Sequence, residues 1–214
     1  MIALTKDGSF WQITLERPDR ANALTADMLE ALIEAVSQAH SDAQALVITG
    51  TGRTFSAGAD LDEARTGLAT SPLWERLSAA IARLPCLSIA ALNGTLAGGA
   101  FGMALACDLR LAVPEARLFY PVMKLGFLPQ PSDPGRLVAL VGPARARMIL
   151  LAGQPVSAPV ALEWGLIDRL ADPGDLIAES RALAEAALAA PRAHLAAVKR
   201  MIPWPVQTPW PGAP

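Results

Sequence analysis

Two loops of small residues carry the clearest sign of chemistry in this sequence. Ser56 to Ala59 are all small, and the stretch from Asn93 to Ala100 is rich in glycine. Such residues let a ligand approach the main chain closely. The second loop precedes a predicted helix, whose first N–H groups lack partners and carry positive partial charge. One N–H from each loop would form an oxyanion hole, with each donor worth ~3 kcal/mol. Tight strand–helix packing around glycines explains the same pattern equally well.

The first loop also approaches two other motifs without completing either. Gly50-Thr51-Gly52 follows a predicted strand, as in a dinucleotide-binding fingerprint, but Phe55 stands where the third glycine belongs. Thr54-x-Ser56-x-Gly58 lacks the first glycine of a nucleophile elbow. A serine hydrolase also needs a histidine, and neither His40, at a helix end, nor His194, in a late helix, has an obvious acidic partner. Both interpretations are therefore weak.

The elements that must position these loops alternate between strands and helices. Residues 2–16 predict two strands around Asp7-Gly8, a strong hairpin signal. Thr25 is expected to cap a helix that ends near His40. The apolar pattern predicts further strands over 45–49, 87–92, 109–113 and 166–170, and helices over 73–84, 99–106, 137–140, 144–151, 158–164 and 176–190. This alternation indicates the α/β class.

The stretch from Leu87 to Cys107 carries no formal charge, and its length would suit a membrane span. Several glycines and Asn93 interrupt the run, and no aromatic or basic belt flanks it. We therefore interpret it as a strand, a glycine turn and a buried helix, and we expect no association with a membrane.

The composition limits the class of protein further. The chain has 214 residues, of which 52% are apolar and 18% charged, with a formal net charge of −2. This excludes a disordered chain, favours a single domain, and argues against a nucleic-acid partner. Two His and two Cys argue against a metal cluster or a disulfide scaffold, and Cys86 and Cys107 are expected to be reduced core residues. The N-terminus lacks the pattern of a signal peptide, so we expect a cytoplasmic protein.

Four segments together resemble the signatures of the crotonase superfamily, the enoyl-CoA hydratase/isomerase family. They are residues 13–24 (ITLERPDRANAL), 46–61 (LVITGTGRTFSAGADL), 93–108 (NGTLAGGAFGMALACD) and 162–168 (LEWGLID). Their consistent order and spacing make the resemblance specific. It decides the open question about the two loops in favour of an oxyanion hole.

The resemblance implies a crotonase-like spiral of ββα units, within the α/β class. One acyl-CoA-binding domain is expected over residues 1–200, with a helical part from about residue 132. A proline-rich tail is expected over 201–214, and with it a shortened C-terminal helical region. Members of the family usually assemble as trimers or pairs of trimers, so a homo-oligomer is expected, with a role in fatty acid metabolism.

The implied ligand is an acyl-CoA thioester, acting as substrate, with no separate cofactor and no metal. By position, the amide N–H groups of Ala59 and Gly99 would hold the thioester oxygen. Lys199 matches a family lysine near the CoA phosphates, although a solvated helix lysine fits this position as well. The CoA moiety would lie along four further residues, Arg20, Ala21, Ala57 and Leu61.

The usual catalytic carboxylates are missing. Family hydratases place two glutamates across the substrate, because burial can tune their pKa values apart. Their positions hold Gly102 and Val122 here, and neither residue can titrate. We expect an enzyme of lyase or isomerase type with weak standard hydration. The alternatives are a family decarboxylase or thioester hydrolase, and a non-catalytic acyl-CoA-binding or scaffold protein.

Two residues could replace the lost carboxylates as acid–base groups. Asp133 lies in residues 125–135, which resemble the glycine-rich loop that lines the family's acyl pocket, and Tyr120 lies beside the second missing glutamate. Each has an ordinary alternative. Ser132 or Asp133 before Pro134 is a common helix N-cap, and a lone tyrosine at a strand end is commonly a packing residue.

Overall fold

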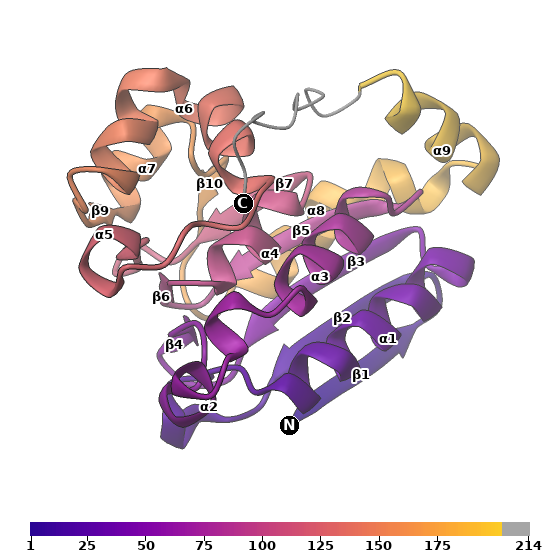
Figure 1. Cartoon of the computed structure of the whole chain (residues 1–214). Helices are drawn as coiled ribbons and strands as arrows, with labels where there is room; N and C mark the ends of the chain where they lie inside the picture. The colour runs from indigo at the N-terminus through magenta and orange to yellow at the C-terminus, as the bar shows by residue number, and fades with distance from the viewer. Residues whose placement is uncertain (203–214) are drawn as a thin grey trace.

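Two β-sheets organise the fold in the computed structural model, which describes residues 1–202 (Figure 1). The strands are β1 (Ile2–Asp7), β2 (Phe10–Leu15), β3 (Ala45–Gly50), β4 (Thr54–Ser56), β5 (Leu87–Leu92), β6 (Thr95–Ala97), β7 (Leu109–Ala112), β8 (Arg117–Phe119), β9 (Val156–Ser157) and β10 (Arg169–Leu170). The larger sheet has the order β1-β2-β3-β5-β7-β10, and the smaller has the order β4-β6-β8-β9. The pairs β1–β2 and β8–β9 are antiparallel, whereas the other pairs are parallel.

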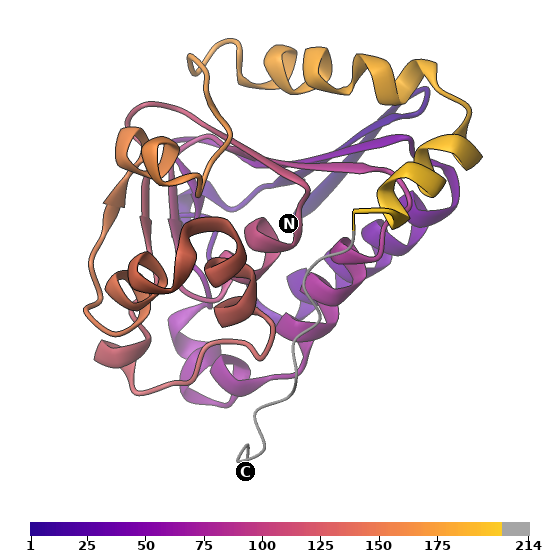
Figure 2. The ribbon, with the colours of Figure 1, turned by 90° about the horizontal axis from the view of Figure 1, so that it is seen from above.

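Helices cover both faces of the larger sheet. The helices of the described chain are α1 (Ala26–Asp42), α2 (Leu61–Arg65), α3 (Leu73–Ala82), α4 (Ala100–Ala106), α5 (Val122–Leu125), α6 (Asp133–Leu150), α7 (Ala158–Trp164), α8 (Leu176–Ala189) and α9 (Arg192–Arg200), with short 3-10 turns η1 (Pro18–Arg20) and η2 (Leu68–Thr70). Figure 2 shows α8 on one side of the sheet and α1 with α3 on the other. Among residues 1–202, no helix is both long enough and apolar enough to cross a bilayer.

The strands and helices form a spiral in which each turn adds one strand to each sheet. β3 is followed by β4, β5 by β6, and β7 by β8, and a helical segment follows each pair. Because the pairings between successive turns are parallel, the segments that follow the strands gather at one side of the molecule. The predicted α/β spiral of ββα units is confirmed.

Several predicted elements lie where the sequence indicated. The first hairpin turns at Gly8, whose φ of +57° suits glycine, and pairs Asp7 with Phe10. Thr25 caps α1, because its side chain accepts a hydrogen bond from the Met28 amide at 3.2 Å. The uncharged stretch forms β5, a glycine turn and α4, and every residue of α4 is buried.

One predicted strand is shorter in the structure, and one predicted helix begins earlier. The strand expected over 166–170 is only β10, because Gly165 ends α7 in the left-handed conformation and the amides of Leu166 and Ile167 bond back to the Ala161 carbonyl. The helices expected over 137–140 and 144–151 are both present as the two parts of α6, which Gly142, in a non-helical conformation (φ +77°), divides before Pro143, although the first part begins earlier, at Asp133.

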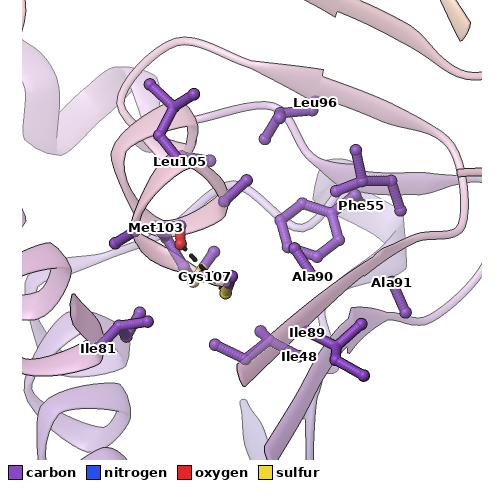
Figure 3. Packing of buried hydrophobic residues seen from close by; sticks show 14 of the residues in the cluster. Ile48, Phe55, Ile81, Ile89, Ala90, Ala91, Leu96, Met103, Leu105 and Cys107 are labelled. Carbon is purple, nitrogen blue, oxygen red and sulfur yellow. Dashed lines mark hydrogen bonds between the residues drawn. The ribbon is translucent and has the colours of Figure 1, made fainter. Parts of the chain in front are cut away.

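The core lies between the larger sheet and the helices on its faces. Figure 3 shows Phe55 of β4 beside Ala90 and Leu96, in one apolar space, and all three side chains are at most 1% exposed. Cys86 and Cys107 are buried and free, as expected. Burial raises the pKa of Cys86 to about 11 and that of Cys107 to about 12, so both thiols stay protonated at neutral pH.

The C-terminal end of the described chain lies at the surface of this core. No residue of α9 is buried, and Met201 and Ile202, which follow it, are 81% and 74% exposed. The proline-rich tail predicted over 201–214 lies outside the described residues from position 203 onward.

Candidate active site

The two small-residue loops predicted to carry the chemistry touch each other. The first connects β4 to α2, and the second connects β6 to α4. Gly58 has φ +93°, and a Cβ atom built on it would lie 2.9 Å from the Ala97 carbonyl oxygen and 3.2 Å from the Gly99 nitrogen. Only glycine fits both this backbone conformation and this close approach. The loops that carry Ala59 and Gly99 are therefore held in backbone contact.

The amide groups of Ala59 and Gly99 are not used by the fold itself. In the Leu24–Ala59 bridge, the bonds run from the Leu24 amide to the Gly58 carbonyl and from the Asp60 amide to the Leu24 carbonyl. Within the part of the chain that the structure describes, neither the Ala59 nor the Gly99 amide donates to a protein atom. Two such donors in adjoining loops, one of them at the start of α4, can stabilise an oxyanion.

Hydrogen bonds brace the first loop on both sides. Asp60 caps α2 by accepting from the amides of Asp62 and Glu63. Arg17 donates to Asp60 at 2.8 Å, and this bond holds the pKa of the Asp60 carboxyl below its ordinary value. Because the carboxylate is charged and bonded on both sides, the loop is fixed just before α2.

Four residues expected along CoA lie around this loop. The Ala57 amide donates to the Ala21 carbonyl at 2.9 Å, which joins the η1 segment containing Arg20 to the first loop. Arg20 is exposed, and Leu61, the first residue of α2, is 72% exposed. The structure thus brings Arg20, Ala21, Ala57 and Leu61 to one edge beside Ala59. Their contact with CoA stays a prediction.

Lys199 lies on another part of the molecule. Its Nζ donates to the Cys86 carbonyl at 2.7 Å and to Asp108 Oδ2 at 2.6 Å. Asp108 also accepts hydrogen bonds from the amide and hydroxyl of Ser88. Lys199 lines a groove of about 900 Å³ whose other walls come from α1 and from the end of α3. Its ammonium is thus engaged in attaching α9 to the core, and its role at CoA stays a prediction.

The space beside Gly102 is filled by Gln130. A Cβ atom at position 102 would lie 2.3 Å from Gln130 Oε1 and 2.6 Å from Nε2. Gln130 Nε2 donates to the Gly99 carbonyl at 2.7 Å, whereas Oε1 is buried and has no partner among the described residues. An uncharged carboxamide therefore lies where a side chain at position 102 would begin. Gln130 was not predicted as a site residue, although a polar residue between Pro129 and Pro131 was a signal of one.

The structure brings the two acid–base candidates together. Tyr120 Oη donates to Asp133 Oδ2 at 2.9 Å and accepts from the main-chain N–H of Gln130 at 3.4 Å. The Tyr120 ring stacks on Phe101 of α4, with ring centroids 5.2 Å apart. Val122, at the second expected glutamate position, is buried in the core. Tyr120 therefore links the Gln130 loop to α4 and to Asp133.

Asp133 lies in a strongly perturbed environment. It is fully buried, and burial raises the pKa of its carboxyl to about 7, although the bond from Tyr120 opposes this change. Arg136, 7% exposed, is the nearest cation, and its Nη1 lies 3.9 Å from Asp133 Oδ1, which is too far for a hydrogen bond. Burial, followed by the Asp133 carboxylate, raises the pKa of Tyr120 well above its ordinary value.

The helix-cap alternative holds for Ser132 by position and not for Asp133. Ser132 is the N-cap residue of α6 and Pro134 lies in the first turn, but no side-chain hydrogen bond caps the helix. The amide and hydroxyl of Ser132 both donate to Glu75 Oε2, at 3.2 Å and 3.0 Å. Glu75 of α3 thus holds Ser132, and the carboxylate of Asp133 accepts from Tyr120. Arg136 was not predicted as a site residue, although it follows Asp133 by three residues, a spacing that places two side chains side by side on a helix.

Comparison with known proteins finds many similar chains. A family model described as enoyl-CoA hydratase/isomerase matches residues 5–209. A probable enoyl-CoA hydratase of Bacillus subtilis (strain 168) is 36% identical over 192 residues, which cover 86% of this chain and 74% of that protein. A short-chain-enoyl-CoA hydratase of Clostridium acetobutylicum is 30% identical over 195 residues, covering 86% of this chain and 73% of that protein.

Solved structures show the same architecture. The crystal structure of an enoyl-CoA hydratase from Bacillus anthracis superposes with a TM-score of 0.86 at 27% sequence identity. The superposition covers 94% of this chain and 81% of that one. The likeness therefore extends over both sheets and the loops that carry the candidate site.

Proposed function

The chain belongs to the enoyl-CoA hydratase/isomerase family, and from that premise we propose that it binds an acyl-CoA thioester and stabilises its enolate. The amide groups of Ala59 and Gly99 hold the thioester oxygen. One observation carries this proposal: the two amides lie in loops in backbone contact at Gly58, and neither donates to a protein atom within residues 1–202. Preorganised donors of this kind stabilise the charge that develops on a thioester oxygen.

Tyr120 and Asp133 supply the proton transfer in this proposal. The α-proton of the thioester moves to Tyr120 Oη while the Tyr120 proton moves to Asp133 Oδ2, and the electron pair of the C–H bond becomes the enolate. Reprotonation runs through the same groups in reverse. A carboxyl whose pKa is about 7 suits this task, because it can accept and return a proton near neutral pH. The 2.9 Å hydrogen bond supports the relay, since a tyrosine whose pKa is raised does not ionise by itself.

The reaction is proton transfer rather than addition of water. Hydration needs a group that activates water beside the acyl chain, and neither Gly102 nor Val122 can do this. Gln130 occupies the space next to Gly102, and a carboxamide is neither an acid nor a base at neutral pH. We therefore assign an isomerase- or lyase-type reaction that begins with an enolate, and expect only weak hydration of crotonyl-CoA.

The rest of the ligand follows the edge beside the first loop. CoA lies along Arg20, Ala21, Ala57 and Leu61, where an exposed cation and an exposed apolar side chain can meet its phosphates and its adenine. Lys199 is a further candidate for the CoA phosphates because it matches a family lysine in the sequence, and it would have to release Asp108 and the Cys86 carbonyl to reach them. The protein works as a homo-oligomer, a trimer or a pair of trimers, and needs no metal or separate cofactor.

Exchange of the α-proton tests the enzymatic proposal. The protein is incubated with butyryl-CoA in deuterated water, and loss of the α-proton signal is followed by NMR. We expect exchange well above the rate without protein, and a large decrease in Asp133→Asn. A rise in the thermal midpoint with butyryl-CoA reports binding separately, because a ligand that binds only the folded state stabilises it. Binding without exchange would overturn the catalytic part alone.

A second candidate is a non-catalytic acyl-CoA-binding or scaffold protein. The observation that favours it is burial, because Asp133 is fully buried and Tyr120 is only 5% exposed. Such a protein would bind butyryl-CoA without exchanging its α-proton. A family decarboxylase or thioester hydrolase would use the same oxyanion hole, and release of carbon dioxide or of free CoA would identify either one.

A further inference from the structure

Unpaired buried atoms gather in one short segment beside the proposed oxyanion hole. Four buried side-chain nitrogen or oxygen atoms of residues 1–202 have no hydrogen-bond partner, and three of them belong to residues 130–136. These three are Gln130 Oε1, Asp133 Oδ1 and Arg136 Nη1. Native proteins rarely leave such atoms unpaired, and each exception calls for an explanation, of which a role in binding or catalysis is one. Proton transfer accounts for Asp133 with its neighbour Arg136, but it gives no task to Gln130 Oε1.

The position of Gln130 Oε1 is fixed by the NH2 group of the same side chain. Gln130 Nε2 donates to the Gly99 carbonyl at 2.7 Å, so the carboxamide cannot turn without losing that bond. Oε1 is thereby held over Gly102, where the missing side chain leaves room for it. The loop is also anchored through its main chain, because the main-chain N–H of Gln130 donates to Tyr120 Oη. The acceptor is therefore preorganised.

Gly99 connects this acceptor to the ligand. Its amide faces the thioester oxygen in the proposed function, and its carbonyl holds the Gln130 carboxamide. Gly102 follows Gly99 by three residues and shares its face of α4, and the Gln130 carboxamide lies against Gly102, so we place Gln130 beside the first carbons of the acyl chain. Phe101, which stacks on Tyr120 in this region, is apolar and buried. A plain alkyl chain in this place would leave Oε1 without a partner.

We propose that Gln130 is a specificity-determining residue, whose Oε1 accepts a hydrogen bond from a hydroxyl group on one of the first carbons of the acyl chain. This inference rests on the proposed function, because it needs the thioester at Ala59 and Gly99. A neutral donor fits best, since a carboxamide oxygen carries no charge and a carboxylate on the substrate would meet an acceptor. Sites that present a buried polar group discriminate strongly against ligands that leave it unpaired.

Calorimetric titration with matched ligands tests this role. The dissociation constants of butyryl-CoA and of 2-, 3- and 4-hydroxybutyryl-CoA are measured for the full chain, for Gln130→Met and for Gln130→Asn. Methionine keeps the length without the acceptor, and asparagine keeps the carboxamide but withdraws it by one methylene. Gln154→Met is the matched control, because Gln154 is exposed on the loop after α6.

We expect the native chain to bind at least one hydroxylated ligand about tenfold more tightly than butyryl-CoA, as one well-made hydrogen bond allows. The preference should fall to near unity in Gln130→Met and Gln130→Asn, and persist in Gln154→Met. Equal binding of all four ligands by the native chain, or a preference that survives in both Gln130 variants, overturns the inference and leaves the proposed function standing. Failure of every ligand to bind overturns both.

Discussion

Tyr120 and Asp133, thirteen positions apart in the sequence, meet in a hydrogen bond of 2.9 Å between Oη and Oδ2. The carboxyl is fully buried and the tyrosine is 5% exposed. Because the pKa of Asp133 is raised to about 7, the pair holds a carboxyl that is partly protonated at neutral pH. An ordinary helix cap would be ionised there, since the pKa of an exposed Asp is near 4.

The first prediction concerns stability and its dependence on pH. A carboxyl whose pKa rises from about 4 in the unfolded chain to about 7 in the folded one favours folding only while it is protonated. Its contribution is fully present below pH ~4 and is lost as the pH rises to ~7. Asparagine cannot ionise and still accepts from Tyr120. We therefore expect Asp133→Asn to be more stable than the native chain at pH 8, by a margin that shrinks toward pH 4.

Denaturant unfolding across this pH range measures the effect. Asp172→Asn serves as the control, because Asp172 is exposed, and it should leave the pH profile of the native chain unchanged. A constant difference between Asp133→Asn and the native chain at every pH would show that the carboxyl does not titrate between pH 4 and 7.

Exchange of the α-proton should follow the same ionisation. In the proposed relay, Asp133 accepts the proton only when it is ionised, so the rate for butyryl-CoA should rise with pH and level off above ~7. Tyr120→Phe removes the hydroxyl that connects the carboxyl to the substrate and should reduce exchange by about 100-fold or more. NMR rates between pH 5 and 9 would settle the matter. If the exchange rate of the native chain showed no step near pH 7, Asp133 would not be the group that accepts the proton.

The sequence predicted the long elements well and the short ones poorly. β5 and α4 were placed correctly, because a run of apolar residues broken by glycines has one plausible interpretation. The strands β4, β6 and β8 have three residues each, too few for a periodic pattern, and they exist because successive turns of the spiral pair them. The helix α2 was missed although Asp60 precedes Glu63 by three residues, which is a capping signal.

The site was also predicted only in part: the features carried by local motifs were foreseen, and those that depend on packing were not. Contact between the loops of Ala59 and Gly99 was foreseen, because local sequence motifs carry those loops. The Tyr120–Asp133 bond and the position of Gln130 were not, since they depend on where α6 and its preceding loop pack against α4. Asp133 was weighed as a helix cap for the same reason: nothing local in the sequence indicates that Glu75, on α3, holds Ser132 instead.

Gly58 tests the arrangement of the oxyanion hole. Gly58→Ala forces a side chain into a left-handed backbone and to within 2.9 Å of the Ala97 carbonyl oxygen, so the two loops must separate. We expect stability to fall by ~1–3 kcal/mol and the stabilisation by butyryl-CoA to be largely lost. Gly174→Ala is the matched control, since nothing lies within 4 Å of its Cβ position and its φ is ordinary. If butyryl-CoA stabilised Gly58→Ala as much as the native chain, the contact between these loops would not be needed for binding.

Gly102 and Gln130 should be coupled in stability. In most helices Gly→Ala stabilises by up to ~1 kcal/mol, but at position 102 the new methyl group would lie 2.3 Å from Gln130 Oε1. The carboxamide must then leave its bond to the Gly99 carbonyl. We expect Gly102→Ala to destabilise the native chain and to stabilise a Gln130→Ala background. Unfolding of the four chains of this cycle measures the change of sign, and additive effects would contradict the contact.

Hydration of crotonyl-CoA gives the last prediction, because it asks whether the same contact limits the chemistry. The native chain should hydrate crotonyl-CoA weakly, since position 102 has no carboxylate. Gly102→Glu alone should not help, because the new side chain would begin in the space that Gln130 occupies. Gly102→Glu combined with Gln130→Gly makes room for the carboxylate and should hydrate faster than either single variant. The loss of enoyl absorbance measures all four chains. Ordinary enzyme rates in the native chain would instead show that Asp133 or Tyr120 activates water.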